Sequence, residues 1–229
     1  MPRGVIFDVD GVLVDSYDAH FQSWRDILSE SGLELTEEGF ARTFGRTSRE
    51  IIAQFWGDGV SAAESRAIDD RKEALYRDIV RRSFPAMAGA VELIDALRGA
   101  GLALAVGSSA PPENVALSLD GLARRHAFAA VVTGHDVTRG KPDPQVFLLA
   151  AQRLGIVPRC CVVIEDAQAG IRAAGAAGMA SVALLGTATA EKLRDAGARL
   201  TVRSLRELSP ALLGELIDEH ALSARPLGG

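Results

Sequence analysis

Short runs of consecutive apolar residues recur along this chain, separated by longer segments in which apolar residues have a helical spacing. A run of about four to six apolar residues is typical of a strand buried on both faces of a parallel sheet. Such runs predict strands at Gly4–Val9, Leu102–Val106, Ala129–Thr133, Cys160–Ile164, Ser181–Leu185 and Arg199–Val202. Helices are expected between them at Ala90–Ala100, Glu113–Leu122, Pro144–Leu154, Ala167–Ala177 and Thr189–Ala196. This alternation predicts a doubly wound α/β domain with a parallel sheet.

The alternation stops between Ser16 and Pro85. No strand pattern occurs in this stretch, whereas Phe21, Trp24 and Leu28 fall on one face of a helix. The stretch therefore indicates a helical subdomain inserted after the first strand. We expect residues 1–15 and 86–229 to form an α/β core domain and residues 16–85 to form an α-helical insert.

Composition excludes several classes of function. The 229 residues are 48% hydrophobic with a formal net charge of −5, and charges of both signs are scattered along the chain. There is no basic block to bind nucleic acid and no apolar stretch of the ~20 residues that span a membrane, and we expect no targeting segment. The adjacent Cys160 and Cys161 would point to opposite faces of a strand, so we expect free thiols. We expect a cytoplasmic monomer.

Polar side chains gather where the predicted strands end. In a parallel α/β sheet, ligands bind beyond the carboxyl ends of the strands. The residues delivered there are Asp8, Asp10, Ser108, Ser109, Glu165 and Asp166, with Lys141 following the third strand. Carboxylates crowded in one place repel one another unless a cation lies among them. Mg²⁺ fits, because it prefers oxygen ligands and binds through one or two carboxylates and a substrate phosphate.

Together, these groups are typical of an enzyme that transfers a phosphoryl group. Asp8 is a candidate nucleophile, and Asp10 can donate and accept the proton of the leaving or attacking oxygen. Ser108 and Ser109 precede a helix opened by two prolines, where backbone N–H groups favour an anion. Lys141 can neutralise the remaining acid charge and the phosphate.

Two other interpretations of these residues are excluded by the spacing of the residues that they require. An EF-hand loop that began at Asp8 would need a Gly at position 13 and a Glu at position 19, where the chain has Leu13 and Ala19. A P-loop needs Ser or Thr directly after its Gly-Lys pair, and Lys141 is followed by Pro142. No GxGxxG motif occurs, so a dinucleotide site has no support.

The ordered motifs resemble those of the haloacid dehalogenase superfamily. The resemblance covers essentially the whole chain, through residues 8–16 (DVDGVLVDS), 106–109 (VGSS), 140–144 (GKPDP) and 164–167 (IEDA). It implies a Rossmann-like core and, for residues 16–85, the α-helical cap of the beta-phosphoglucomutase-like and phosphatase branch.

The resemblance also implies a role for each matching residue. Asp8 would attack phosphorus, and Asp10 would act as acid and then base with its backbone carbonyl on Mg²⁺. Ser108 and Lys141 would hold the phosphate, with Ser109 beside them. Asp166, with help from Glu165, would complete the metal site. An acid at Asp10 argues against dehalogenation, because dehalogenases of the superfamily lack an aspartate there.

Substrate choice is expected to come from the cap, where His20, Arg49 and Lys72 are the candidates. His20 lies one turn before Trp24, so it is equally a packed helix histidine. Arg49 lies in a run that resembles the substrate-contacting cap loop of beta-phosphoglucomutase, although it could simply pair with Glu50. Lys72 lies in a charged run that could be a solvated helix face.

Several functions are compatible with these motifs. The favoured one is a Mg²⁺-dependent phosphatase acting on a small phosphorylated metabolite such as a sugar phosphate. The alternative is a beta-phosphoglucomutase. The mutase pattern has Ser and then Lys where this chain has Ala110-Pro111-Pro112, and this difference favours hydrolysis. A phosphonate-cleaving enzyme would need Lys72 as a Schiff-base lysine. A catalytically silent binding module would be expected to lack one of the four acid and lysine positions, and all are present.

Overall fold

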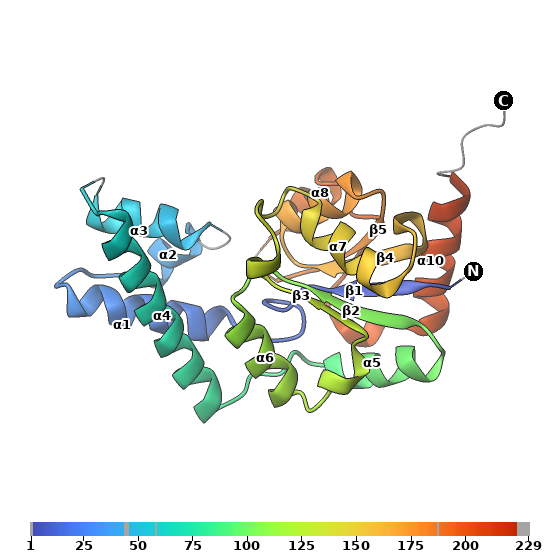
Figure 1. Cartoon of the computed structure of the whole chain (residues 1–229), viewed down its shortest axis with the longest axis horizontal. Coiled ribbons are helices and arrows are strands. Elements are labelled where there is room, and N and C mark those ends of the chain that lie inside the picture. Colours follow the sequence, from blue (N-terminus) through green and yellow to red (C-terminus); the bar gives the residue numbers. More distant parts are fainter. Residues whose placement is uncertain (1, 44–45, 58, 187, 224–229) are drawn as a thin grey trace. The chain divides into compact units, whose positions relative to one another are not determined.

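The computed structural model describes residues 2–43, 46–57, 59–186 and 188–223. Their contacts divide the chain into two compact units, one of Met1–Asp15 with Ala86–Gly229 and one of Ser16–Pro85 (Figure 1). The first contains the sheet and is called the core unit. The second spans the stretch without a strand pattern and is called the helical unit.

The core unit is built on a six-stranded sheet in which all paired strands are parallel. Its strands are β1 (Gly4–Phe7), β2 (Ala103–Gly107), β3 (Ala130–Val132), β4 (Cys161–Glu165), β5 (Ala180–Leu184) and β6 (Leu200–Val202). Their order in space is β3-β2-β1-β4-β5-β6, the order of the doubly wound Rossmann fold. The predicted α/β fold with a Rossmann-like parallel sheet is confirmed.

Helices cover the sheet because its strands are apolar on both faces. The helices of the core unit are α5 (Ala90–Gly99), α6 (Pro112–Gly121), α7 (Gln145–Leu154), α8 (Gln168–Ala176), α9 (Ala190–Asp195) and α10 (Pro210–Ser223). Figure 1 shows α7 and α8 on one side of the sheet and α5 and α6 on the other. Between these layers Val5, Ile6 and Phe7 are fully buried. Every strand and core helix expected from the sequence lies within two residues of its predicted bounds.

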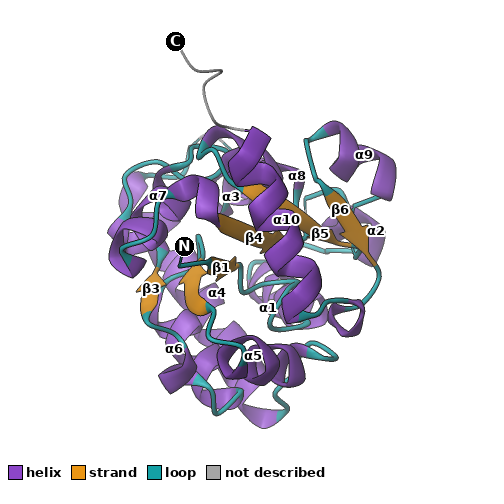
Figure 2. Cartoon of the chain, turned by 90° about the vertical axis from the view of Figure 1, so that its right-hand side faces the viewer, coloured by secondary structure: helices purple, strands orange, loops and turns teal. Residues whose placement is uncertain are grey.

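Helix α10 is the element that the sequence analysis did not anticipate. It packs on β4 and β5, and Figure 2 shows it in front of these strands. It buries Leu213, Gly214 and Ile217, and its Asp218 accepts hydrogen bonds from Arg3. A buried face that contains a glycine and few large apolar residues gives a weak helical pattern in the sequence.

The helical unit consists of α1 (Tyr17–Glu30), α2 (Glu37–Ala41), α3 (Ser48–Trp56) and α4 (Ala62–Arg82) among the described residues. Capping boxes begin two of these helices, Thr47 with Glu50 at α3 and Ser61 with Glu64 at α4. The helices surround an apolar core of their own, made of Trp24, Ile27, Leu28, Leu35, Phe40, Ile51 and Ile52. Nowhere in the described part of the chain is a helix both long and apolar enough to cross a bilayer.

The core unit holds the two ends of its insertion side by side. The chain leaves this unit after Asp15 and returns at Ala86. Val14 forms an antiparallel bridge with Ala86, and the Met87 amide donates a hydrogen bond to the Leu13 carbonyl at 3.0 Å. The outgoing and returning segments are therefore paired within the core unit.

A polar turn anchors the segment that leaves β3. The Thr133 backbone amide and hydroxyl both donate to Asp136, at 2.8 and 2.9 Å, and Arg153 of α7 donates to the other oxygen of the same carboxylate. The Arg153 hydrogen bond is the main reason that the pKa of Asp136 is lowered to about 2, and the Thr133 hydrogen bonds act in the same direction. This turn lies a few residues before Lys141.

We predict that Asp136→Asn destabilises the protein at neutral pH. An aspartate with a folded-state pKa near 2 and an ordinary value of 3.8 stabilises the fold above about pH 4. That contribution is lost as the pH falls through 2. After allowance for solvent screening we expect a loss of about 1 kcal/mol at pH 7. Urea unfolding at pH 7 and near pH 2 tests this. Asp195→Asn, an exposed control, should change little, and an Asp136→Asn effect that is equal at both pH values would refute the linkage.

Candidate active site

The sheet brings Asp8 and Glu165 together through strand register. Phe7 of β1 lies opposite Ile164 of β4, so the next residues, Asp8 and Glu165, emerge side by side at the carboxyl ends of these strands. The Asp8 amide still donates to the Ile164 carbonyl at 3.0 Å, which extends the pairing by one residue. In the strand order, β1 is followed by β2 and β3 on one side, whereas β4 is followed by β5 and β6 on the other. The boundary between β1 and β4 is therefore the switch point of the sheet, where α/β proteins bind ligands.

Lys141 lies between these two carboxylates. Its Nζ is 2.6 Å from Asp8 Oδ1 and 2.8 Å from Glu165 Oε1, and its side chain is 9% exposed. Burial by itself would lower the pKa of Lys141, but the charges of Asp8 and Glu165 outweigh burial and raise it well above its usual value. Lys141 is therefore a fixed ammonium group at neutral pH.

Three carboxylates meet at this point. One oxygen each from Asp8, Glu165 and Asp166 lies within 4.8 Å of the others, and all three residues are buried. Burial, aided by the charges of Glu165 and Asp10 and opposed by Lys141, raises the pKa of Asp8 to about 7. Burial and the neighbouring acids likewise raise the pKa of Asp166 well above its usual value. Full ionisation of the three acids would therefore place more negative charge here than Lys141 balances.

The donor set fits a magnesium ion. If all three carboxylates are ionised, one ammonium leaves two uncompensated negative charges, which a divalent cation would neutralise. Oxygen ligands are those that Mg²⁺ prefers. Asp10, whose side chain is half-buried, lies outside this cluster of carboxylate oxygens. The resemblance assigned its backbone carbonyl, not its carboxylate, to the metal.

Two glycines that the sequence analysis missed adjoin the acids. A Cβ at Gly170 would lie 1.8 Å from Glu165 Oε1, and a Cβ at Gly11 would lie 2.2 Å from Asp166 Oδ2. Gly11 also has a φ of 73°, in the left-handed region. The other Glu165 oxygen accepts a hydrogen bond from the Ala167 amide at 2.6 Å. Because neither glycine has a side chain, the carboxylates of Glu165 and Asp166 can occupy this space. In the sequence, the feature that could have indicated these contacts is a glycine that follows each acidic pair within a few residues.

The predicted phosphate segment follows β2. Because Phe7 lies opposite Val106, Ser108 emerges next to the end of β1. Ser108 is 1% exposed, and its Oγ accepts a hydrogen bond from the Ala110 amide at 3.1 Å, whereas Ser109 is exposed. Pro111 and Pro112 begin α6 as the sequence predicted.

In the helical unit, two of the three expected cap residues lie together. Lys72 Nζ is 2.9 Å from His20 Nδ1 and 2.7 Å from Glu73 Oε1, and Lys72 is 3% exposed. The His20 ring stacks on Tyr76 with centroids 4.1 Å apart. Lys72 therefore lies in a buried cluster rather than on a solvated helix face, with Glu73 as a partner that the sequence analysis missed. Arg49 lies apart from this cluster, exposed in the first turn of α3.

Comparison with known proteins identifies the family. The model of the haloacid dehalogenase-like hydrolase family matches residues 2–178, so the chain belongs to this hydrolase family. The chain is 34% identical over 179 residues to the fructose-1-phosphate phosphatase YqaB of Escherichia coli, covering 78% of this chain and 94% of that protein. It is 31% identical over 227 residues to the beta-phosphoglucomutase of Bacillus subtilis, covering 96% and 97% of the two chains.

The fold has close counterparts among solved structures. A beta-phosphoglucomutase from Clostridium difficile superposes with a TM-score of 0.84 at 24% sequence identity, covering 97% of this chain and 100% of that one. At this identity the likeness establishes the fold.

We predict that Gly170→Ala damages the site, whereas Gly175→Ala in the same helix does not. A methyl group at residue 170 displaces the Glu165 carboxylate, while no atom lies within 4 Å of the added Cβ at residue 175. Gly170→Ala should lose about 1–3 kcal/mol of stability and bind Mg²⁺ several-fold more weakly. Gly175→Ala should be neutral or gain about 0.5–1 kcal/mol. Urea unfolding and calorimetric Mg²⁺ titration measure both, and equal behaviour of the two variants would contradict the steric argument.

Proposed function

We propose that this protein is a Mg²⁺-dependent phosphatase that hydrolyses a small phosphorylated metabolite, a sugar phosphate, through an aspartyl-phosphate on Asp8. The observation that carries the proposal is the buried group of Asp8, Lys141, Glu165 and Asp166 at the switch point of the sheet. Membership of a hydrolase family and the similarity to a fructose-1-phosphate phosphatase support it.

The first half-reaction moves the phosphoryl group to the protein. One oxygen of the Asp8 carboxylate attacks phosphorus, and the bond between phosphorus and the substrate's bridging oxygen breaks. Asp10, two residues further on, gives its proton to that departing oxygen, so the product leaves as an alcohol. Lys141, held against Asp8 at 2.6 Å, orients the attacking carboxylate and adds positive charge beside the phosphate.

The second half-reaction restores the enzyme. Asp10, now a carboxylate, accepts a proton from a water molecule as the water oxygen attacks phosphorus. The bond between phosphorus and the Asp8 oxygen breaks, and inorganic phosphate is released. Ser108 and Ser109 are proposed to hold the phosphate oxygens during both steps. Mg²⁺, held by Asp8, Glu165, Asp166 and the Asp10 backbone carbonyl, would neutralise phosphate charge when bound.

The helical unit is proposed to act as the cap that selects the substrate, through His20, Arg49 and Lys72. For His20 and Lys72 the support is their contact at 2.9 Å, which joins them in one polar group. Lys72 Nζ is already held by Glu73 at 2.7 Å and by His20 at 2.9 Å, which opposes a Schiff-base role. Action as a cytoplasmic monomer stays a prediction from composition.

Intramolecular phosphoryl transfer is the second candidate. It is favoured by the similarity to a beta-phosphoglucomutase along 96% of the chain. A mutase must hold a second phosphate while the first reacts, and Pro111 and Pro112 open α6 without the cation expected there. This absence supports hydrolysis over transfer.

Asp8→Asn should lower kcat by at least about 10³-fold, because an amide is a poor nucleophile for phosphorus. The variant should remain folded by circular dichroism. Asp120→Asn, the same change at an exposed position of the core unit, should retain full activity. An Asp8→Asn protein that turns over at a near-normal rate would exclude the covalent mechanism.

The substrate class is tested by a phosphate-release screen over sugar phosphates, nucleotides and small phosphorylated acids. Release from sugar phosphates, abolished by a chelator and restored by Mg²⁺, is the expected result. Beta-glucose 1-phosphate with a trace of its bisphosphate, assayed for glucose 6-phosphate, runs in parallel. Isomerisation without phosphate release would establish the mutase instead, and activity that survives metal removal would refute the Mg²⁺ assignment.

A further inference from the structure

An aromatic ring accompanies the two carboxylates at the Lys141 ammonium. Lys141 Nζ lies over the ring of Phe147, 4.8 Å from the ring centroid, in addition to its contacts with Asp8 and Glu165. A cation within about 6 Å of a ring centroid is attracted by the negative charge of the ring face. Phe147 is fully buried, and the proposed reaction gives it no part. The ammonium therefore has a neutral neighbour as well as two acidic ones.

The loop that carries Lys141 is tied to the helix that carries the ring. Phe147 lies in the first turn of α7, which begins at Gln145. The Gln145 side-chain oxygen accepts hydrogen bonds from the backbone amides of Thr138 and Arg139, at 3.0 and 3.1 Å. The start of α7 thus holds the segment that leads into Lys141 as well as the ring that the lysine contacts.

The end of β2 leaves room for the ring. A Cβ at Gly107, the last residue of β2, would lie 2.9 Å from Cδ1 of Phe147 and 3.2 Å from Cγ2 of Ile6. Because a side chain at this position would displace the ring, the glycine permits its close approach to the sheet. The place of the ring is therefore set by the same two strands that deliver Asp8 and Ser108.

A neutral partner suits an ammonium in this position. Another carboxylate would add negative charge beside acids that already repel one another. A hydroxyl or a carbonyl would accept an N–H of the lysine and so compete with Asp8 and Glu165. The face of a phenylalanine ring attracts the positive charge without offering a strong hydrogen-bond acceptor. Both carboxylate contacts of Lys141 can therefore persist beside the ring.

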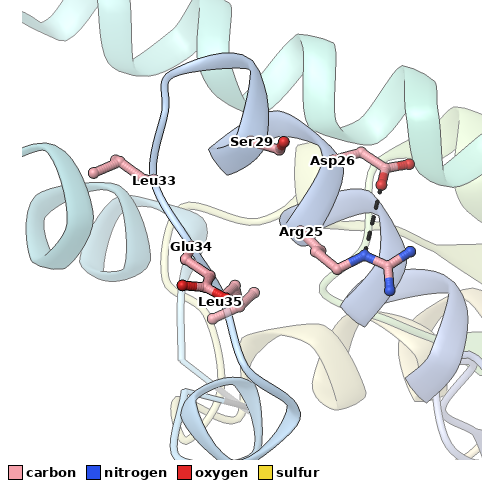
Figure 3. A pocket seen from close by; sticks show the side chains of 6 residues that line it. All are labelled: Arg25, Asp26, Ser29, Leu33, Glu34 and Leu35. Carbon is pink, nitrogen blue, oxygen red and sulfur yellow. Dashed lines mark ion pairs between the residues drawn. The ribbon is translucent and has the colours of Figure 1, made fainter.

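Arg25 of the helical unit provides a contrast. Its guanidinium lies 5.6 Å from the centroid of the Phe21 ring. Arg25 lines a hollow of about 280 Å³, where it points toward Asp26 and pairs with it at 3.8 Å (Figure 3). The Arg25 side chain is 53% exposed, whereas that of Lys141 is 9% exposed. Since water competes with a ring for an exposed cation, the contact at Lys141 is the stronger of the two.

We propose that Phe147 is a positioning residue, whose ring face holds the Lys141 ammonium against Asp8 and Glu165. Lys141 in turn fixes the orientation in which Asp8 is presented to phosphorus. Phe147 acts through Lys141 alone and transfers no proton or charge itself. The kinetic consequence rests on the proposed phosphatase function, whereas the contact and its effect on the lysine do not.

Fluorination of the ring tests the contact with little change of shape. Site-specific incorporation places phenylalanine with one, two or three ring fluorines at residue 147 of the full chain. Each fluorine withdraws electrons from the ring face and weakens its attraction for a cation. We expect the logarithm of kcat/KM, measured on the substrate found in the phosphate-release screen, to fall steadily with fluorine number. The trifluoro protein should lose about threefold to tenfold.

A purely structural ring predicts a different result. Fluorine adds apolar surface, so packing alone would leave the protein as stable and as active as before. Phe128 is the matched control, because it is buried in the core unit and packs edge-on against Phe7 with ring centroids 6.0 Å apart. The same fluorinated residues at position 128 should leave kcat/KM unchanged. A kcat/KM that is independent of fluorine number at position 147 overturns the proposal.

The second measurement needs neither substrate nor metal. The chain contains three lysines, Lys72, Lys141 and Lys192, so a protein labelled with carbon-13 at lysine gives few signals to assign by NMR. The ring current of Phe147 should shift the Cε protons of Lys141 upfield of those of the exposed Lys192. Phe147→Leu should move this signal back toward that of Lys192, and carbon-13 relaxation should show a more mobile Lys141 side chain.

The two measurements separate the failure of this proposal from that of the proposed function. Phe128→Leu, which also removes a buried ring, should leave the Lys141 signal and its mobility unchanged. A Lys141 side chain that is equally rigid in Phe147→Leu refutes the positioning role, whether or not the protein is a phosphatase. If no substrate is turned over but Phe147→Leu frees Lys141, the positioning role stands and the proposed function alone fails.

Discussion

The candidate active site depends on one electrostatic constraint: buried carboxylates that stay ionised can lie side by side only where positive charge accompanies them. Asp8 and Glu165 come together because β1 and β4 are neighbouring parallel strands in register. Their mutual repulsion in a dry environment would oppose this arrangement without the ammonium of Lys141, which contacts both. Burial, together with the neighbouring carboxylates, raises the pKa of Asp8 and Asp166. Negative charge in excess of that on Lys141 would make the region suited to a divalent cation and, through it, to a phosphate.

Much of this arrangement could be predicted from the sequence, because it follows from periodicity and strand ends. Apolar runs specify buried parallel strands, and the residue after each run must emerge at the same edge of the sheet. This rule places Asp8 and Glu165 at one edge of the sheet from the sequence alone. It could not give the contact of Lys141 with both acids, because Lys141 follows β3 by several residues and its reach depends on the loop. Helix α10 was not predicted for a different reason. Its buried face consists of Gly214 and two apolar residues, which give only a weak helical pattern in the sequence.

The helical unit was predictable in kind but not in detail. Helical spacing of Phe21, Trp24 and Leu28 indicated helices. Sequence could not show that Lys72, within a highly charged run, is buried against Glu73, because long side chains place their charged ends by tertiary packing. Gly170 is a similar case. A glycine within a helix usually weakens it, and only the position of the Glu165 carboxylate explains why no larger residue fits there.

The pairing of Val14 with Ala86 bears on how such proteins diversify. Since the core unit holds both ends of the insertion together, a replacement segment needs only matching termini to be joined at that point. The entropy of closing a chain segment grows slowly, by about 0.6 kcal/mol for each doubling of its length. Inserts of very different size are therefore nearly equivalent for the folding of the sheet. Evolution can therefore exchange the inserted unit while the sheet and the residues at its edge are inherited unaltered.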